Sequence, residues 1–516
     1  MSESTRDSPT VQRSAYHRLT DAEEGALEEG AGGMSESKLE VENAEPKSPT
    51  LALQPLVGRP SLTDRFLRRG KRKIRVTNSL KAIVFSSWLN ILLLAIPFSW
   101  VFHFMADSEE EGHHSWAMPA FFLSFVALIP LAKLLEYGGD QMTFYLGPDL
   151  GDLLVVTLNN SVEATLAIIL LKKCELKLLQ SSVIGVVLLR LLLVPGVAFV
   201  TGGSHLLEQD LHPALTELNH TLLTVGVFCL LLPAAFFSAM NRGGVAQTAA
   251  QVAREVSATS ESFINDTNRG NILAISRGLS VILLAVYVVS RIFLHKPPGE
   301  GTANFREHAL APEALRERAL EFENEDPELN QWVCIGFVVV TFLALAATAE
   351  WLVDSVDVVE DLFTKEWFGL ILLPLVSFSG DAFNAILYFI RATYRSLRGQ
   401  SAPPNTLANA RPIDLSIQFI MFWMPFIILL GWWTDRPISL LFDSFEVALL
   451  ISSCFIVNYV TADAKTNYAE GFAMLAYWLI ALTAWFYTGQ SEINSFLACG
   501  SVAEAVVAAA AGGGER

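Results

Sequence analysis

Long apolar stretches alternate with short polar ones along most of the chain after residue 80. A helix that crosses a bilayer needs about 20 consecutive apolar residues. Eleven stretches meet that requirement approximately, at 81–106, 116–136, 148–172, 178–201, 217–240, 272–294, 331–353, 367–390, 413–433, 444–461 and 469–488. The pattern predicts an all-α polytopic membrane protein with 11 transmembrane helices.

Composition supports the same class. The 516 residues are 52% hydrophobic and only 17% charged, and the mean hydropathy of +0.39 is too high for a soluble protein of this length. The net charge of −17 is concentrated in polar segments that are expected to face water. Five cysteines are scattered without a CxxC pair, which predicts neither a disulfide framework nor a zinc site.

The ends of the chain and its loops indicate an orientation. Residues 1–78 read as a disordered cytosolic tail that ends in a basic cluster at 65–75. By the positive-inside rule this cluster places the N-terminus in the cytosol, and contact with anionic lipid explains it more simply than a nucleic-acid-binding arm. The arginine-rich loop 391–411 falls on the same side, whereas Lys172, Lys173 and Lys177 fall on the opposite side, against the rule. The low-complexity segment 489–516 also falls opposite the N-terminus.

The chain also repeats itself. FVALIPLAKLLEYGGD at 125–140 echoes FLALAATAEWLVDSVD at 342–357 with an offset of 217, unless both stretches only share a leucine-rich composition. We therefore expect one helix at 79–110, a five-helix repeat at 116–294, an acidic cytosolic loop at 295–330 and a second five-helix repeat at 331–488. Five is odd, so the repeats lie in opposite orientations, as in secondary transporters whose site lies at the midplane.

Two carboxylates lie near the middle of matching spans, Glu163 in the first repeat and Asp381 in the second, 218 positions apart. A charged side chain at a helix centre costs roughly 2.5–3.5 kcal/mol to insert, so such residues usually mark an ion or proton site. The alternative is a carboxylate held by a polar neighbour for packing. Their matching places predict one shared site.

Further oxygen-bearing side chains surround these acids. Ca²⁺ takes about six to eight oxygen ligands, and carboxylates that bind either the ion or protons would couple the two fluxes. Helical spacing puts Asn160 on the face of Glu163, and puts Ser377 and Asn384 on the face of Asp381. The candidate site comprises these five residues with Thr157 as a neighbour.

A second acidic stripe, Glu350, Asp354 and Asp357, runs along the seventh span. Glu350 is the deepest and is the better site candidate, since Asp354 and Asp357 also fit a solvated helix end. The acidic run before that span holds Glu321, Glu323, Glu325, Asp326 and Glu328. It is either a solvated loop or a regulatory sensor of divalent cations.

Several stretches resemble the cation/proton exchanger family, the vacuolar calcium/proton antiporters of fungi and plants. They are IPLAKLLE (129–136), ILAISRGLSVILL (272–284), AEWLVDSVD (349–357), FGLILLPLV (368–376), IVNYVTADAKTNYAEG (456–471) and the acidic segment before residue 331. The resemblance covers roughly 80–490. It implies eleven spans, a vacuolar membrane and exchange of cytosolic Ca²⁺ for lumenal protons.

The chain departs from the family's signature, approximately G-N-A-x-E in each half. The first half keeps Asn160 and Glu163, whereas the second reads SFSGD at 377–381 and continues with Ala382 in place of the usual histidine. On span 9, Ser416 and Gln418 match a polar pair of the family and join the candidate metal-site residues.

Arg190 is the most informative departure, because family members have an asparagine in this helix. Arginine stays protonated in proteins. If it points inward, Glu163 or Asp381 is its expected partner, and the central charge falls from about −2 to −1, which favours a monovalent ion or a proton over Ca²⁺. The alternative is that Arg190 reaches an interface or a salt bridge elsewhere.

Together with the acids within the spans, this resemblance implies a secondary active antiporter that moves a cytosolic cation, with Ca²⁺ first, into the vacuole or a related acidic organelle in exchange for protons. Monovalent cation exchange and a non-transporting regulatory paralogue stay open as alternatives. Motifs for ATP binding or hydrolysis are missing, so no catalytic residue, cofactor or nucleic-acid partner is expected. Expected partners are membrane lipid, the cation and the proton, and homo-oligomerisation stays open.

Overall fold

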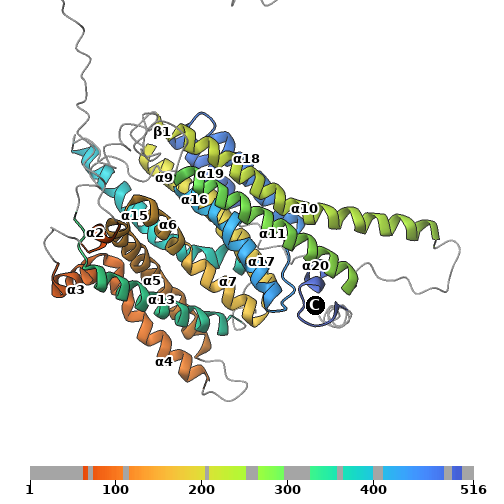
Figure 1. Ribbon diagram of the computed structural model, residues 1–516, viewed down its shortest axis with the longest axis horizontal. Coiled ribbons are helices and arrows are strands. Elements are labelled where there is room, and N and C mark those ends of the chain that lie inside the picture. Colours follow the sequence, from red (N-terminus) through yellow and green to blue (C-terminus); the bar gives the residue numbers. More distant parts are fainter. Residues whose placement is uncertain are drawn as a thin grey trace, which may run out of the picture. The chain divides into compact units, whose positions relative to one another are not determined.

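The computed structural model describes residues 62–67, 74–107, 116–203, 208–251, 265–295, 326–356, 364–398, 411–481 and 491–502. Almost all of these residues are helical, and one small sheet pairs the strands β1 and β2 (Figure 1). The expected disordered tail up to residue 61, most of the acidic loop (296–325) and the end of the chain (503–516) lie outside the described residues.

Helices follow one another along the chain, with two short strands among them. In order, the elements are α2 (Leu62–Phe66), α3 (Val76–Phe85), η1 (Trp88–Leu94), α4 (Ala95–Asp107), α5 (Ala117–Leu146), α6 (Pro148–Asn159), α7 (Ser161–Lys173), α8 (Leu176–Leu188), η2 (Leu189–Leu193), α9 (Val194–Gly203), β1 (Gln209–Asp210), α10 (Pro213–Gln251), α11 (Asp266–His295), α13 (Gln331–Asp354), α14 (Lys365–Trp367), η4 (Phe368–Leu372), α15 (Leu373–Leu397), α16 (Arg411–Gln418), η5 (Phe419–Trp423), α17 (Met424–Trp433), α18 (Ser444–Val460), β2 (Lys465–Thr466), α19 (Tyr468–Ala481) and α20 (Ser491–Phe496).

Seven helices within the described ranges are long and apolar enough to cross a membrane, and a bent pair raises the count to eight. The seven are Trp88–Ala106, Ala117–Leu146, Leu176–Gly203, Pro213–Ala239, Asp266–Leu294, Gln331–Asp354 and Pro412–Trp433. The shorter helix α18 is apolar but falls below the required length. The predicted class, a helical protein with several spans, is confirmed, whereas the number 11 and the inverted repeats stay predictions.

The span predicted at 148–172 is a bent pair rather than one helix. Leu150–Asn159 and Ser161–Lys173 meet at an angle of 51°. At the bend, the backbone N–H of Asn160 donates to the Thr157 carbonyl at 3.2 Å, and the Ser161 hydroxyl donates to the Leu158 carbonyl at 2.6 Å. These short-range bonds interrupt the regular helical ladder. The bend therefore leaves polar backbone groups available beside Asn160.

Three helices contain a π-helical turn, η2, η4 and η5, and each turn precedes a proline by two positions. The prolines are Pro195, Pro374 and Pro425. Proline has no N–H to bond the carbonyl four residues earlier, and after each turn an N–H bonds five residues back, as from Val194 to Leu189. Such turns are frequent at functional sites, and here they lie in the helices that surround Glu163.

The first apolar span begins later than expected. It runs from Trp88 to Ala106 instead of starting at 81, and α3 forms a separate helix before it. The Asn90 side chain donates to the carbonyls of Ile83 and Val84 at 2.9 and 3.1 Å. Because those carbonyls are satisfied by a side chain, the helix ends there without continuing into the span.

The first and second halves of the chain approach closely at a pair of glycines. A Cβ atom on Gly185 of α8 would lie 2.2 Å from the carbonyl oxygen of Leu370, and one on Gly369 of η4 would lie 3.0 Å from that of Leu178. Small residues allow such backbone approach between membrane helices. This contact brings the helix that carries Arg190 against the start of the helix that carries Asp381.

The strands β1 and β2 pair antiparallel, with Gln209 opposite Thr466. Beside them the Lys465 ammonium donates to the Glu208 carboxylate at 2.8 Å. This hydrogen bond and the charge of Glu208 raise the pKa of Lys465 above its ordinary value. The pairing brings the loop before α10 and the loop before α19 to one side of the protein.

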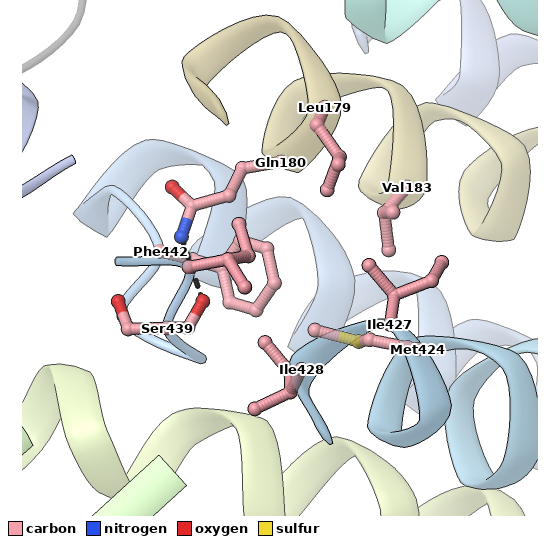
Figure 2. A pocket seen from close by; sticks show the side chains of 9 residues that line it. Leu179, Gln180, Val183, Met424, Ile427, Ile428, Ser439 and Phe442 are labelled. Atoms are coloured by element: carbon pink, nitrogen blue, oxygen red, sulfur yellow. Dashed lines mark hydrogen bonds between the residues drawn. The ribbon is translucent and has the colours of Figure 1, made fainter. Parts of the chain in front are cut away.

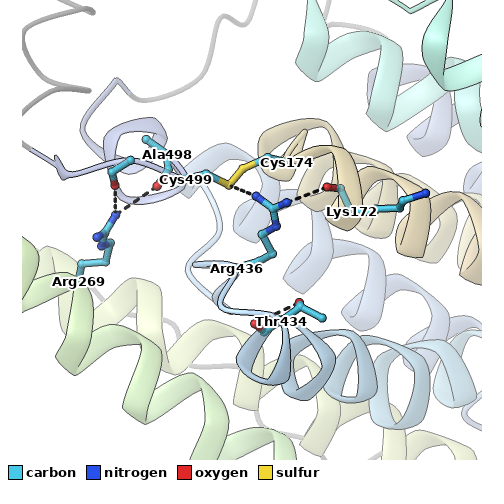
Figure 3. The surroundings of a disulfide bond; sticks show 9 residues. Lys172, Cys174, Arg269, Thr434, Arg436, Ala498 and Cys499 are labelled. Carbon is cyan, nitrogen blue, oxygen red and sulfur yellow. Dashed lines mark hydrogen bonds between the residues drawn. A yellow bond between two sulfur atoms is a disulfide. The ribbon is translucent and has the colours of Figure 1, made fainter.

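A disulfide joins Cys174, at the end of α7, to Cys499 near the end of the chain (Figure 3). The two residues are 325 positions apart, and their Cα atoms are 6.5 Å apart. The expectation that the cysteines form no disulfide framework is therefore wrong for this pair, because such a sequence separation gives no local signal. Cys229, Cys334 and Cys454 are free.

Two arginines hold the same C-terminal segment. Arg436 donates to the Lys172 carbonyl at 3.1 Å and contacts the Cys499 sulfur at 3.5 Å. Arg269 donates to the carbonyls of Ala498 and Gly500 at 3.1 and 2.8 Å (Figure 3). The segment 491–502 is thus fastened to the ends of α7, α11 and α17.

Cys174→Ser is expected to free the Cys499 thiol and to loosen this segment, because a disulfide that closes a long loop contributes about 2–4 kcal/mol. Alkylation of the unfolded, unreduced protein followed by mass spectrometry should modify three cysteines in the wild type and one more in the variant. Cys229→Ser is the control and should lose one modification. Five modified cysteines in the unreduced wild type would contradict the disulfide.

Candidate functional site

Arg190 and Glu163 form a buried ion pair between η2 and α7. The Nη2 and Oε1 atoms are 2.5 Å apart, and each residue is only 5% exposed. A guanidinium stays charged, and a buried charge without a partner is strongly destabilising. Glu163 is thus one of the two partners expected for Arg190, and the structure directs the guanidinium inward rather than to an interface.

Two more oxygens hold the guanidinium. Arg190 donates through Nη2 to the Asn159 carbonyl at 3.0 Å and through Nη1 to Oδ1 of Asn160. The Asn160 amide nitrogen in turn donates to Oε1 of Gln418, whose own amide nitrogen lies 3.4 Å from the Thr157 hydroxyl. The sequence-predicted residues Thr157, Asn160, Glu163 and Gln418 therefore come together, and Arg190 lies among them.

The second carboxylate oxygen of Glu163 is buried and has no hydrogen-bond partner among the described side chains, which do not include those of Ser377, Asp381 and Asn384. Glu163 lines a small cavity of about 10 Å³ together with Leu166, Ser182, Val186, Leu373, Pro374 and Phe419. A cavity of this size is about the minimum that holds one water-sized particle. The free oxygen is thus the atom of Glu163 that is open to a proton or a cation.

Local structure accounts for these positions. Glu163 lies in the first turn of α7, where the partial positive charge of a helix N-terminus favours an anion. The bend at Asn160 leaves the Asn159 carbonyl available to Arg190. Arg190 itself lies in the π turn η2, and its guanidinium carbon is 5.9 Å from the centre of the Phe419 ring in η5.

The second-half residues of the predicted site are placed only in part. Ser416 is buried, but its hydroxyl donates to the Pro412 carbonyl of its own helix at 3.1 Å. Ser377, Asp381 and Asn384 belong to α15, and their side chains lie outside the described part of the structure. The helix itself contacts α7, α8 and α9, so these three stay predicted site residues.

The part of the chain that contains these helices matches known proteins. Residues 116–295 and 333–487, well over half of the chain, match the family described as sodium/calcium exchanger protein. The chain belongs to this family. The resemblance seen in the sequence is thereby confirmed.

Two curated relatives of this exchanger are fungal. The vacuolar calcium ion transporter of Cryptococcus neoformans var. grubii is 30% identical over 492 residues, which span 82% of this chain and 77% of the relative. That of Schizosaccharomyces pombe is 29% identical over 439 residues, which span 84% and 93%. The solved structure of native YfkE superposes with a TM-score of 0.54 at 19% identity, over 77% of this chain and 99% of the other, so the two share a fold.

Glu350 lies away from the Arg190 pair of this exchanger. Its carboxylate is 3.3 Å from the Lys172 ammonium, with both side chains largely exposed, and Asp354 pairs with Lys173. Lys172 is nine residues along α7 from Glu163, about 14 Å at 1.5 Å per residue. In the predicted orientation, which puts Lys172 and Lys173 on the side disfavoured by the positive-inside rule, these acidic partners would neutralise the two lysines. Asp357 lies outside the described residues.

Of the predicted regulatory acids, the structure describes the last two, Asp326 and Glu328. Glu321, Glu323 and Glu325 lie outside the described residues, and Asp326 is exposed. Glu328 accepts a hydrogen bond from the Tyr137 hydroxyl at 2.7 Å. The sensing and solvated-loop interpretations both stay untested.

A second buried ion cluster was not predicted from the sequence. Lys177 at the start of α8 pairs with Asp443, and its ammonium is 3.8 Å from Glu446 at the start of α18. Both carboxylates are almost fully buried, and Ser181 donates to Glu446 at 2.6 Å. Asp443 and Glu446 also form a capping box for α18, a D-x-x-E signal in the sequence that reveals the helix start but not the lysine.

The next turn of α8 fixes the adjacent loop (Figure 2). Gln180 donates to the carbonyls of Ser439 and Leu441 at 2.8 and 3.0 Å. It lines a small, mostly apolar cavity with Val183, Met424 and Phe442. Lys177 and Gln180 therefore hold the 434–443 loop against α8, which gives this cluster a structural role.

The cluster around Glu163 has no complete metal cage among its described side chains. No group of three or more His, Cys, Asp or Glu residues within the described ranges is close enough to hold a metal. Glu163 and Arg190 together are neutral, and their polar neighbours are amides and a carbonyl. The arrangement therefore offers one free carboxylate oxygen, which can take a proton or a cation.

Proposed function

We propose that this protein is a cation/proton antiporter that moves a cytosolic cation into the vacuole in exchange for protons by alternating access. Ca²⁺ is the first candidate, because the relatives from C. neoformans and S. pombe are named vacuolar calcium ion transporters. Glu163 is the exchanging carboxylate, with Asp381 as its counterpart on α15.

One observation carries the proposal, the buried Glu163 carboxylate at the break between α6 and α7. Broken helices beside a midplane site are typical of secondary transporters, and an acid in that place usually binds ions or protons. Gln418, from the second half of the chain, reaches the same cluster through Asn160. A site shared by the two halves is what alternating access between them requires.

Contacts between loops support eleven spans with a cytosolic N-terminus and a far-side C-terminus. In that topology Cys174, Lys177, Asp443 and Cys499 share the lumenal side, and they pair with one another. The strands β1 and β2 share the cytosolic side, and they also pair. These contacts also support two inverted five-helix repeats. The names of the fungal relatives support a location in the membrane of the vacuole or a related acidic organelle.

Arg190 favours two alternatives to Ca²⁺ exchange. Because its charge neutralises Glu163, the site suits a monovalent cation better than a divalent one. A non-transporting paralogue is the other alternative, in which the ion pair replaces the cargo permanently. The free oxygen of Glu163 supports exchange over the paralogue, since a purely structural pair would use both oxygens.

Purified full-length protein in liposomes with an acidic interior tests the proposal. We expect radiolabelled Ca²⁺ to accumulate inside and to leave when a protonophore dissipates the gradient. Suppression by K⁺ or Na⁺ would assign a monovalent cargo. Lack of gradient-dependent uptake of Ca²⁺, K⁺ and Na⁺ alike would overturn the antiporter function and leave the paralogue.

A further inference from the structure

Within the described part of the structure, the Arg190 guanidinium donates its hydrogen bonds to three oxygen atoms. They are Oε1 of Glu163, Oδ1 of Asn160 and the Asn159 carbonyl oxygen. Carboxylate, amide and carbonyl oxygens are also the ligands that hard cations such as Ca²⁺ take from proteins. The guanidinium thus occupies a position that is built to hold positive charge.

The orientation of the amides fits a cation as well as an arginine. Asn160 turns its oxygen toward Arg190 and its nitrogen toward Gln418. A metal ion at the guanidinium position would need the same oxygen in the same place. Replacing the guanidinium by a cation therefore requires no reversal of the Asn160 and Gln418 side chains.

A second, independent feature points to a ligand at this place. Oε2 of Glu163 is buried and has no partner among the described residues. Glu163 itself is only 5% exposed and lines the cavity beside Phe419. Buried carboxylate oxygens usually find partners. Arg190 therefore satisfies only half of this carboxylate, and the other half stays open to an incoming ion.

We propose that Arg190 is a tethered cation that occupies the cargo position and competes with the transported ion for Glu163 and Asn160. This inference rests on the proposed function only in assuming that a cation is the cargo. A cation must displace the guanidinium before it gains the three oxygens. The apparent affinity of the protein for the cation therefore falls in proportion to the fraction of molecules in which the guanidinium has left the site. Arg190 thereby determines the affinity of the site and its preference among cations.

Equilibrium binding of radiolabelled Ca²⁺ to the purified full chain tests the competition. Arg190→Ala is expected to lower the Ca²⁺ Kd about tenfold or more relative to the wild type. Guanidinium chloride at millimolar concentration should reverse this gain, because the free ion refills the vacated position. Urea, which has a similar shape and no charge, should not reverse it.

Arg291→Ala is the matched control. Arg291 is also a buried arginine paired with a carboxylate, since its Nη2 lies 2.6 Å from Oδ1 of Asp414, but it lies outside the predicted site. Its removal should leave the Ca²⁺ Kd within about twofold of the wild type. An equal gain in both variants would show that any unpaired carboxylate binds Ca²⁺ and would overturn the proposal.

Arg190→Lys keeps the test decisive if the alanine variant does not fold. An ammonium is a compact charge without the planar fork of a guanidinium, so it should compete less well and give an intermediate Kd. Identical Ca²⁺ affinity in the wild type and Arg190→Lys, or in the wild type and Arg190→Ala, would refute the competition. If Arg190→Ala gains binding while the wild type exchanges no cation, the antiporter function fails and the tethered-cation inference stands.

Discussion

Glu163→Gln is expected to abolish proton-driven cation uptake and to destabilise the protein by about 3–5 kcal/mol. Glutamine can neither take up a proton nor neutralise a cation, so the exchange at this position is lost. It also leaves the Arg190 charge, which is 5% exposed, without its carboxylate partner. Uptake into acidic liposomes measures the first effect, and denaturant titration in mild detergent measures the second.

Two controls separate these effects. Glu163→Gln combined with Arg190→Gln removes both charges, and should regain most of the stability without regaining exchange, because no unpaired buried charge remains. Glu175→Gln removes a carboxylate that is half-exposed and 3.3 Å from Lys365, and should retain both exchange and stability. Exchange above about a tenth of the wild-type rate in Glu163→Gln would exclude Glu163 as the exchanging group.

Lys177→Met is expected to lower the free energy of unfolding by about 3–5 kcal/mol. The lysine side chain is 12% exposed, and the Asp443 and Glu446 side chains that face it are 0% and 2% exposed. Without the ammonium, two buried carboxylates lose the basic partner that they share. We expect the 434–443 loop and the start of α18 to loosen, which protease digestion of the folded protein in detergent would detect.

Lys172→Met is the matched control on the same stretch of chain. Lys172 is 75% exposed, and its ammonium is 3.3 Å from Glu350, a type of pair that contributes about 0–1 kcal/mol. Equal destabilisation by the two substitutions would show that burial of the Lys177 cluster has no energetic consequence. The comparison also bears on both lysines in the predicted orientation, which puts them on the side that the positive-inside rule disfavours.

The central ion pair changes how exchange is expected to work in this family member. Two ionised carboxylates would give the midplane site a charge of about −2, whereas Arg190 neutralises one of them. On the proposed competition, a cation would enter a site with a charge of about −1 and would have to release a guanidinium that is held by three oxygens. We therefore expect selectivity to depend on competition with an internal charge as well as on the ligands themselves.

Much of the architecture could be predicted from the sequence, because membrane spans depend on local composition. The apolar stretches predict the helical class, and helical spacing with the family resemblance assigns Asn160, Glu163 and Gln418 to one site. Spans 1 and 3 are predicted as unbroken, because side-chain bonds to the backbone at Asn90 and Ser161 do not show in hydropathy. The prolines that follow the three π turns are a signal in the sequence that hydropathy alone does not use.

By itself the sequence determined that this chain lies in a membrane, that Glu163 and Arg190 are charges within apolar helices, and which family it resembles. Only the tertiary structure decided that Glu163 is the partner of Arg190, that Lys177 pairs with Asp443, and that Cys174 bonds Cys499. The physical reason is that hydropathy and helical spacing act over a few residues, whereas a partner depends on how distant helices rotate and pack. Buried charges must find a partner, and the fold alone selects which one.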